Sequence, residues 1–552
     1  MKTNTRAGVT GQDNSAAGNF LVQGSILAAA GIIVRLIGLF YKIPMTRILG
    51  KEGIGYYNTA YEVYSIGLIL SSYSLPLAIS KLIAARRIRG QYQDSRRVFL
   101  CGLGFGFVIG AIMTLFLLFG SDWITTYIFN SPNSALPLKV MAPTILVFSV
   151  MGVIRGYFQG YGNMVPTSLS QIIEQVVNAV VSIAASYWLM NRYAASASQA
   201  SYGAAGGTLG TLCGAVASLV LLCFLLIRNR RSQTALNRLP QSIAVESWKL
   251  IFGSLLMTLT PIILSQFVYQ LSGSVDNAMF GFIMGNKGYI EKERMILLGV
   301  YGGEYRMLSN VPVAIASSLG ASMIPSIVSS RQQRRNTEVK DKIRLTVKFN
   351  MLIAIPCAVG MGVLASPIMQ LIFRDNTQMA VRLMQIGAPA VVFFSLSTVT
   401  NSVLQGVDLM RKSVTHSAIS LGIHVVLVYV MLQYFNWGVY GLVVGNVTFA
   451  LVVCVLNWIA IGRCLNYTQE VKTTFLLPLA AAAVMGVVAV LAYYGVHALV
   501  ASNKLALLIS VPLAMVVYGV LIVVLKAVTE EELMDMPFGG RLLRVGRRLR
   551  LM

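Results

Sequence analysis

The sequence predicts an all-α integral membrane protein of about fourteen transmembrane helices, built as two six-helix repeat lobes followed by two extra C-terminal helices. Three observations support this: a composition suited to lipid, apolar runs of membrane-spanning length along the whole chain, and an internal repeat. Charged residues make up 12% of the 552 residues and apolar residues 56%, whereas soluble domains carry roughly 25% charged residues. We therefore expect lipid to surround most of the chain.

Each predicted helix is an apolar run long enough to cross a hydrocarbon core of ~30 Å, which takes roughly 20 residues. Prolines inside these runs, such as Pro261 and Pro356, are compatible with membrane helices because neighbouring helices satisfy the freed backbone groups. The predicted spans are 20–42, 54–83, 98–119, 137–158, 167–190, 205–227, 250–280, 295–325, 347–371, 381–405, 413–434, 437–461, 475–499 and 503–526. They predict an N-lobe at 1–235, a C-lobe at 236–470, an extra helical pair at 471–528 and a basic tail at 529–552.

The basic residues predict the orientation, since short cytoplasmic loops are enriched in Lys and Arg. Clusters of them at 86–97, 331–348 and 541–550 fall on the same side as both termini, and the N-terminal segment does not read as a secretory signal. We expect a multi-pass protein of the cytoplasmic membrane with both termini cytoplasmic. The net charge of +24 is then a topology signal, and no nucleic-acid partner is expected. The basic tail fits a helix lying on anionic lipid or a solvated segment equally well.

The two lobes are predicted from three matched pairs of segments. Tyr57 and Tyr61 recur as Tyr301 and Tyr305 at an offset of 244, so that helix 2 repeats as helix 8. Ala142-Pro143 recurs as Ala388-Pro389 at an offset of 246, and the glycines at 207, 210 and 214 recur at 438, 441 and 445 at an offset of 231. Six helices separate the copies, so both lobes have the same orientation, as in transporters built from parallel repeats. The glycine strips are expected to allow close helix packing.

Ionisable side chains within the spans are the best functional candidates, because each costs ~2.5 to 3.5 kcal/mol in lipid unless it faces a polar cavity or a partner. For Arg35 in helix 1 and Arg306 in helix 8, a cavity role is favoured over snorkelling to the headgroups. Glu62 is a candidate counter-ion for Arg35.

Four further side chains leave alternatives open. Glu174 is a buried acid that is either protonated or paired, while Lys81 and Arg155 are expected to snorkel at cytoplasmic helix ends. His424 is expected to be a packing group rather than a proton relay. Catalytic motifs are absent from the sequence, so we expect no enzymatic activity and no cofactor, and the six cysteines are expected to be packing thiols.

Several strings resemble the multidrug/oligosaccharidyl-lipid/polysaccharide exporter superfamily, and within it the MurJ, SpoVB and YtgP group of lipid II flippases. They are the segments 35–40 (RLIGLF), 47–50 (RILG), 57–61 (YNTAY) and 75–81 (LPLAISK). The likeness covers nearly the whole chain and extends to the fourteen predicted helices.

The resemblance implies functional residues. Arginines in helices 1 and 8 of MurJ-like proteins line a cationic cavity that receives the substrate pyrophosphate, and they match Arg35 and Arg306. The second cationic position of helix 1 is Tyr41 here, with Lys42 adjacent, and the helix-2 arginine is replaced in a region that holds Glu62. The candidate substrate-binding residues are Arg35, Arg306, Lys42, Arg47 and Glu62. Asp276 matches a helix-7 aspartate implicated in cation coupling, and helices 13 and 14 are implied to form a groove for a polyprenyl tail.

These observations predict a flippase that moves an undecaprenyl-pyrophosphate-linked sugar, most plainly lipid II, by alternating access. The implied partners are the lipid-linked substrate and membrane lipids, the expected state is a monomer, and coupling to Na⁺, H⁺ or the membrane potential is possible. One alternative is a drug or cation antiporter of the same superfamily, against which two cavity arginines argue. The other is a non-transporting scaffold of an envelope or spore-coat assembly complex.

The orientation can be tested by cysteine labelling in intact cells. A cysteine at Gln332 should be protected from an impermeant reagent added outside, because 331–348 is predicted to be cytoplasmic, whereas a cysteine in 286–294 should react. Labelling at Gln332 from outside would refute this topology.

Overall fold

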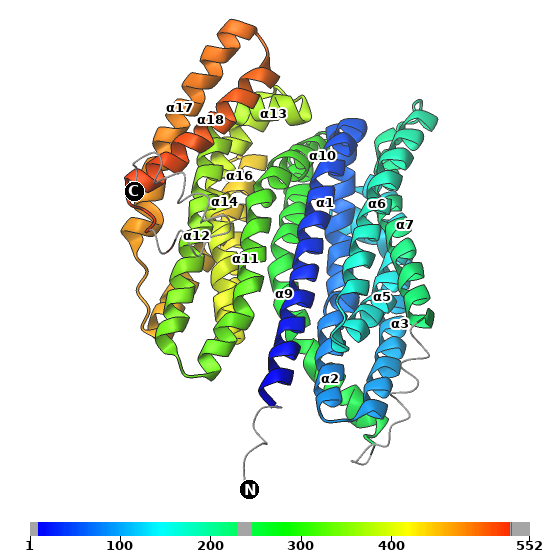
Figure 1. Ribbon diagram of the computed structural model, residues 1–552. Coiled ribbons are helices and arrows are strands. Elements are labelled where there is room, and N and C mark those ends of the chain that lie inside the picture. The colour runs from blue at the N-terminus through cyan, green and yellow to red at the C-terminus, as the bar shows by residue number, and fades with distance from the viewer. Residues whose placement is uncertain (1–8, 229–244, 530–531, 533–552) are drawn as a thin grey trace. The chain divides into compact units, whose positions relative to one another are not determined.

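A computed structural model describes residues 9–228, 245–529 and 532, and every regular element in these ranges is a helix, which confirms the all-α prediction (Figure 1). Most of the predicted basic tail lies outside the described residues. The first half contains α1 (Val9–Leu68), the π-helix η1 (Ile69–Tyr73), α2 (Leu75–Ile88), α3 (Tyr92–Trp123), η2 (Ile124–Ile128), η3 (Pro132–Ser134), α4 (Ala135–Met141), α5 (Pro143–Gly160), α6 (Val165–Arg192), α7 (Gln199–Arg228), α9 (Trp248–Asn286) and α10 (Glu291–Gly299). The second contains the π-helix η4 (Val300–Tyr305), α11 (Arg306–Gln332), α12 (Asn336–Val363), α13 (Ala365–Phe373), α14 (Gln378–Gly406), α15 (Met410–Gln433), α16 (Val439–Leu465), η5 (Lys472–Leu476), α17 (Leu477–Val500) and α18 (Asn503–Val524).

Twelve helices of the described residues are long and apolar enough to cross a membrane. One of them, Ala29–Ile88, contains predicted helices 1 and 2, and predicted helix 8 corresponds to the run from α10 to α11, which is not among the twelve. Each of the other predicted helices has its own counterpart. The multi-pass prediction is therefore confirmed, whereas the count of fourteen stays a prediction.

The long α1 is two helices joined at Gly50. This residue has φ 65° and ψ 178°, a non-helical backbone conformation inside a continuous assignment. A positive φ is accessible to glycine because it has no Cβ. Gly50 therefore separates the helix that carries Arg35 and Lys42 from the helix that carries Tyr57 and Glu62.

The helices form two compact units, residues 1–299 and residues 300–552. Helices α9 and α10 belong to the first unit, where α9 packs on α1, α2 and α3, and α10 packs on α1. The predicted lobe boundary near residue 235 was placed from the sequence repeat, whereas the two units are defined by packing. The boundary therefore stays a prediction. The first unit thus contains more of the chain than the first sequence repeat.

The predicted glycine strips lie at close helix contacts in both units. In the first unit, a Cβ added at Gly214 would lie 2.5 Å from the carbonyl oxygen of Glu174, and one at Gly210 would lie 2.5 Å from the backbone nitrogen of Ser182. In the second unit, a Cβ at Gly445 would overlap the side chain of Val428. Glycine lets α7 approach the backbone of α6 (Figure 1), and on α16 it leaves room for side chains of α15.

The extra helices α17 and α18 pack on each other and on the second unit. Tyr518 donates a hydrogen bond to the carbonyl of Leu352 at 3.0 Å, and Asn503 donates to that of Pro367 at 3.1 Å. A buried ion pair of 2.6 Å joins Lys348 of α12 to Glu532, beyond the end of α18. These contacts attach the pair to α12 and α13.

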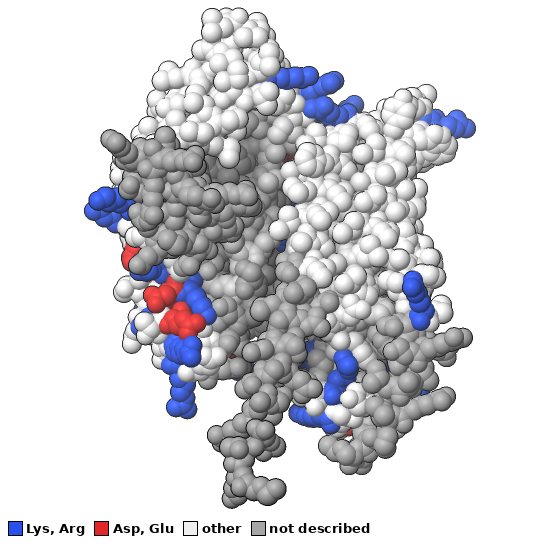
Figure 2. Space-filling model, in the orientation of Figure 1, with Lys and Arg blue, Asp and Glu red and all other residues white. Residues whose placement is uncertain are grey.

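Charged residues are scarce on the surface of the first unit that faces the viewer in Figure 2. The area over α6 and α7 is white along most of its length, with Lys and Arg near its ends. Large apolar side chains on these helices, among them Trp188, Val180 and Phe224, are more than half exposed. A soluble protein rarely exposes an apolar area of this size, but a helix in lipid needs one.

Helices α1 and α10 cross at two matched glycines in the first unit. A Cβ added at Gly55 would overlap the carbonyl of Met295, and a Cβ added at Gly299 would overlap the carbonyl of Lys51. The repeat offset of 244 carries position 51 to 295 and position 55 to 299. The contact is therefore reciprocal, as expected where two equivalent surfaces meet across a two-fold axis.

From this crossing we predict that replacing either glycine by alanine destabilises the folded protein. An exposed helical glycine usually gains ~0.5–1 kcal/mol on replacement by alanine, whereas here the methyl group must displace a backbone carbonyl, at a cost of about 1–3 kcal/mol. We expect Gly55→Ala and Gly299→Ala to lower the melting temperature of the detergent-solubilised protein.

Gly104→Ala is the matched control, because no atom lies within 4 Å of a Cβ at this position of α3. It should leave the melting temperature unchanged or raise it slightly. Equal melting temperatures for Gly299→Ala and Gly104→Ala would contradict the tight crossing.

Candidate functional site

Two basic side chains lie on one face of the first half of α1. Arg35 and Lys42 are seven residues apart, which places them two turns apart on the same helix face. Arg35 is exposed and lies within electrostatic reach of the Tyr73 phenol, and the Lys42 ammonium lies 6.0 Å from the centre of the Tyr61 ring. Arg47 is exposed near the Gly50 turn. The first unit therefore presents a basic face with tyrosines beside it.

Glu62 lies on the second half of α1 and is buried against α9. Its carboxylate accepts hydrogen bonds from Gln270 at 3.1 Å and from Ser274 at 3.5 Å. A Cβ at Gly273 would lie 2.9 Å from the same carboxylate, so glycine is what allows α9 to approach it. Glu62 therefore links α1 to α9, and its role as a counter-ion for Arg35 stays a prediction.

Asp276 is 1% exposed, with Ser274 and Asn277 buried beside it on α9. Asp276 lies ten residues before the end of α9 at Asn286. It also lies beyond Val268, where the part of this helix that is apolar enough to cross a membrane ends. A carboxylate buried this deeply needs polar partners, and its role in cation coupling stays a prediction.

Arg306 is the first residue of α11 and is half-buried in the second unit. Its guanidinium lies 5.8 Å from the centre of the Tyr301 ring, within the range of a cation–π contact. The Tyr301 hydroxyl accepts a hydrogen bond of 2.7 Å from Asn446 on α16, which fixes the ring. Arg306 and Arg35 belong to different units, so their convergence on one cavity stays a prediction.

Arg155 does not snorkel, and this prediction was wrong. It is 8% exposed on α5 and pairs with Glu174 of α6 at 2.8 Å, while Ser170 and Ser218 accept its other hydrogen bonds at 2.9 and 3.2 Å. Glu174 is thus the paired structural acid, one of the two alternatives for it. Buried arginine tolerates this location because its fork-shaped donor set is satisfied from two helices, α6 and α7.

His424 is fully buried on α15. Its ring meets that of Phe449 edge to face at a centroid distance of 5.8 Å and lies close to Gly445. This arrangement agrees with the packing group that the sequence favoured.

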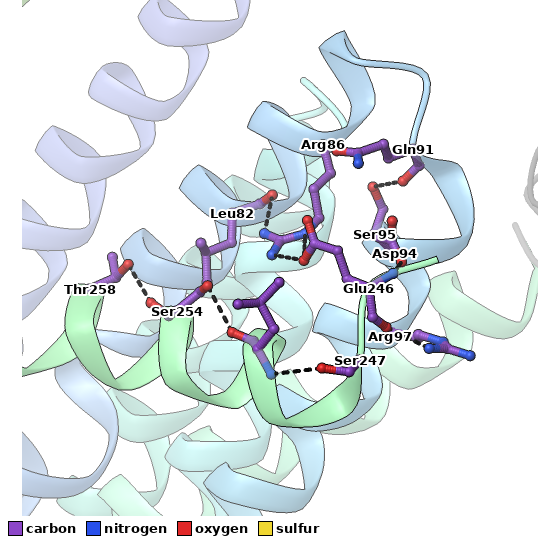
Figure 3. Close-up of polar contacts among 11 residues, drawn as sticks. Leu82, Arg86, Gln91, Asp94, Ser95, Arg97, Glu246, Ser247, Ser254 and Thr258 are labelled. Carbon is purple, nitrogen blue, oxygen red and sulfur yellow. Dashed lines mark hydrogen bonds and ion pairs between the residues drawn. The ribbon is translucent and has the colours of Figure 1, made fainter. Parts of the chain in front are cut away.

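Sequence reasoning missed a polar cluster that attaches the start of α9 to α2 and α3 (Figure 3). Glu246 pairs with Arg86 at 2.5 Å, its backbone carbonyl accepts from Arg97 at 2.6 Å, and its N–H donates to Asp94 at 3.0 Å. Ser247 then caps α9 by accepting from the N–H of Leu250 at 3.3 Å. An isolated acid in a strongly basic segment was the available signal. The cluster fixes one end of the helix that carries Gln270 and Asp276.

The sequence matches two protein families, each over a continuous part of the chain. The polysaccharide biosynthesis protein family matches residues 21–331, more than half of the chain, and the MatE family matches residues 261–430. The chain is 25% identical over 527 residues to stage V sporulation protein B of Bacillus subtilis, which covers 95% of this chain and 99% of that protein. It is 24% identical to the lipid II flippase MurJ of the same organism, covering 85% of this chain and 87% of that protein.

Solved structures share the fold at low sequence identity. One is a lipid II flippase MurJ in an inward closed conformation, with a TM-score of 0.66 and 14% identity, covering 90% of this chain and 97% of that one. Another is an inward-facing multidrug resistance MATE transporter, with a TM-score of 0.61 and 16% identity, covering 80% and 99%. The predicted resemblance to the MurJ and SpoVB group of the exporter superfamily is confirmed, and the chain belongs to the polysaccharide biosynthesis protein family.

Proposed function

We propose that the protein is a flippase of the cytoplasmic membrane that moves an undecaprenyl-pyrophosphate-linked sugar, lipid II first among them. The observation that carries this proposal is the basic face of α1, where Arg35 and Lys42 lie two turns apart within spanning helices. Phosphate oxygens form strong charge-assisted hydrogen bonds with such groups, and a low dielectric strengthens them. The names of its relatives, a lipid II flippase and a sporulation protein, support the same substrate class.

In this proposal the sugar head group crosses through the protein while the polyprenyl tail stays in the bilayer. Arg35 and Arg306 bind the pyrophosphate, with Lys42 and Arg47 adding positive charge along α1. The mechanism is alternating access, in which the binding face opens to each side of the membrane in turn. Both termini are cytoplasmic, the protein acts as a monomer, and no covalent chemistry is required.

The alternative function is a drug or cation antiporter. Such a protein needs a carboxylate that a cationic substrate can reach. In the first unit, Glu174 already pairs with Arg155, and Glu62 accepts hydrogen bonds from Gln270 and Ser274. The charged side chains that are exposed on the spanning part of α1 are Arg35 and Arg47, which are both basic. This distribution of charge favours an anionic substrate. Only an assay of head-group translocation distinguishes a flippase from a scaffold without transport activity.

Replacing either arginine tests the substrate assignment. Arg35→Ala and Arg306→Ala should abolish head-group translocation by purified protein in liposomes, because the remaining cation cannot compensate for a lost bidentate contact. Lysine should restore only part of the activity, since its single ammonium lacks the planar fork of arginine.

Arg192→Ala, in the last turn of α6, is the control and should flip the lipid at the native rate. Membrane insertion and abundance should be near normal in all variants. Native rates for both alanine variants would remove the main reason for preferring an anionic lipid to a cationic drug.

Replacing Asp276 tests whether transport is coupled to an ion. If this buried carboxylate binds Na⁺ or H⁺, Asp276→Asn should remove the dependence of transport on the ion gradient and on the membrane potential. Asp122→Asn is the control, because Asp122 is an exposed partner of Lys139 at 2.6 Å. Unchanged gradient dependence in Asp276→Asn would leave Asp276 with a structural role.

A further inference from the structure

Two tyrosines at equivalent positions of the repeats differ sharply in exposure. Tyr61 and Tyr305 are related by the offset of 244, yet Tyr61 is 41% exposed and Tyr305 only 1%. Equivalent residues in a duplicated fold are expected to have equivalent surroundings unless something nearby has changed. The difference therefore points to an altered neighbour.

The altered neighbour is the residue that faces this tyrosine. In the second unit the Tyr305 ring occupies the space where a side chain at Gly387 would lie, and its hydroxyl donates to the Gly387 carbonyl at 3.3 Å. The offset of 246 carries Gly387 back to Met141 in the first repeat. Met141 is fully buried, and unlike Gly387 it carries a side chain of its own. The first repeat therefore lacks the glycine that gives Tyr305 its recess, and the ring of Tyr61 stays 41% exposed.

The ring of Tyr61 lies beside polar and charged side chains of the first unit. It stacks on Tyr57 with a centroid distance of 6.1 Å and an angle of 18°, and Lys42 lies 6.0 Å from its centre. Its phenol is also within electrostatic reach of Glu62, Glu174 and Tyr73. A ring surrounded by these groups is accessible to a polar ligand.

We propose that Tyr61 is a stacking platform for the first sugar ring of the head group, with the adjacent phosphate held by Lys42; this rests on the flippase function proposed above. A pyranose has a face of C–H groups that packs on the electron-rich face of an aromatic ring, leaving its hydroxyls hydrated. A sugar attached directly to a phosphate presents an apolar face and an anion side by side. Tyr61 and Lys42 offer an aromatic ring and a cation 6.0 Å apart.

The test compares two lipids and two substitutions at Tyr61. The full-length protein in nanodiscs is titrated with undecaprenyl pyrophosphate and with the same lipid carrying its first sugars, and the ratio of the two affinities is the readout. Tyr61→Leu removes the aromatic face but keeps bulk, and it should lower the preference for the sugar-bearing lipid by about tenfold, the order of one aromatic contact. Tyr61→Phe should keep the preference.

Tyr187→Ala is the matched control, because Tyr187 is 61% exposed on α6 and has no part in the proposed site. It should keep the native preference. A Tyr61→Leu protein that keeps the native preference, or a Tyr61→Phe protein that loses it, would overturn the platform while leaving the flippase proposal intact. A native protein that binds neither lipid would overturn both.

Discussion

The cost of a polar group in hydrocarbon is the constraint on which the rest of this structure depends. Two buried charges of the first unit have their partners on other helices: Arg155 binds residues of α6 and α7, and Glu62 binds two residues of α9. These contacts do not by themselves make the protein more stable than an apolar core would, because desolvation cancels much of the attraction. They do specify which helices must be neighbours. Because Glu62 is buried in such a contact, the charged side chains that stay exposed on the spanning part of α1 are basic.

Close approach of helix backbones is the second feature that positions the basic face of α1. Apolar side chains in lipid gain little from moving to a helix interface, so helices associate through packing and need small residues where they cross. Glycines at α6 and α7, at α15 and α16, and at the crossing of α1 and α10 supply these contacts. The crossing at Gly55 and Gly299 fixes the second half of α1, which carries Tyr57, Tyr61 and Glu62. The candidate site is thus held in place by positions that never touch a substrate.

The sequence was sufficient for properties that depend on composition and periodicity. Apolar runs predicted the all-α membrane fold, and matched glycines predicted the close pairing of α6 with α7. It failed where the outcome depends on a partner distant in sequence. Arg155 looked like a snorkelling side chain because nothing in its own helix shows that Glu174 lies opposite. The Glu246 cluster was missed because it joins segments about 150 residues apart.

The division into units differs from the division into repeats, and this matters for the proposed mechanism. The chain passes from one unit to the other once, between Gly299 and Val300, inside a continuous helical run rather than in the loop between the repeats. Gly299 contacts Lys51 of the first unit, whereas Tyr301 is bound by Asn446 of the second. Any relative motion of the units has its covalent pivot between these two attachments, where the helix takes the π form that often marks functional irregularities. Arg306 begins the α-helix directly after this π-helix, so the candidate phosphate-binding residue lies next to the connection between the two units.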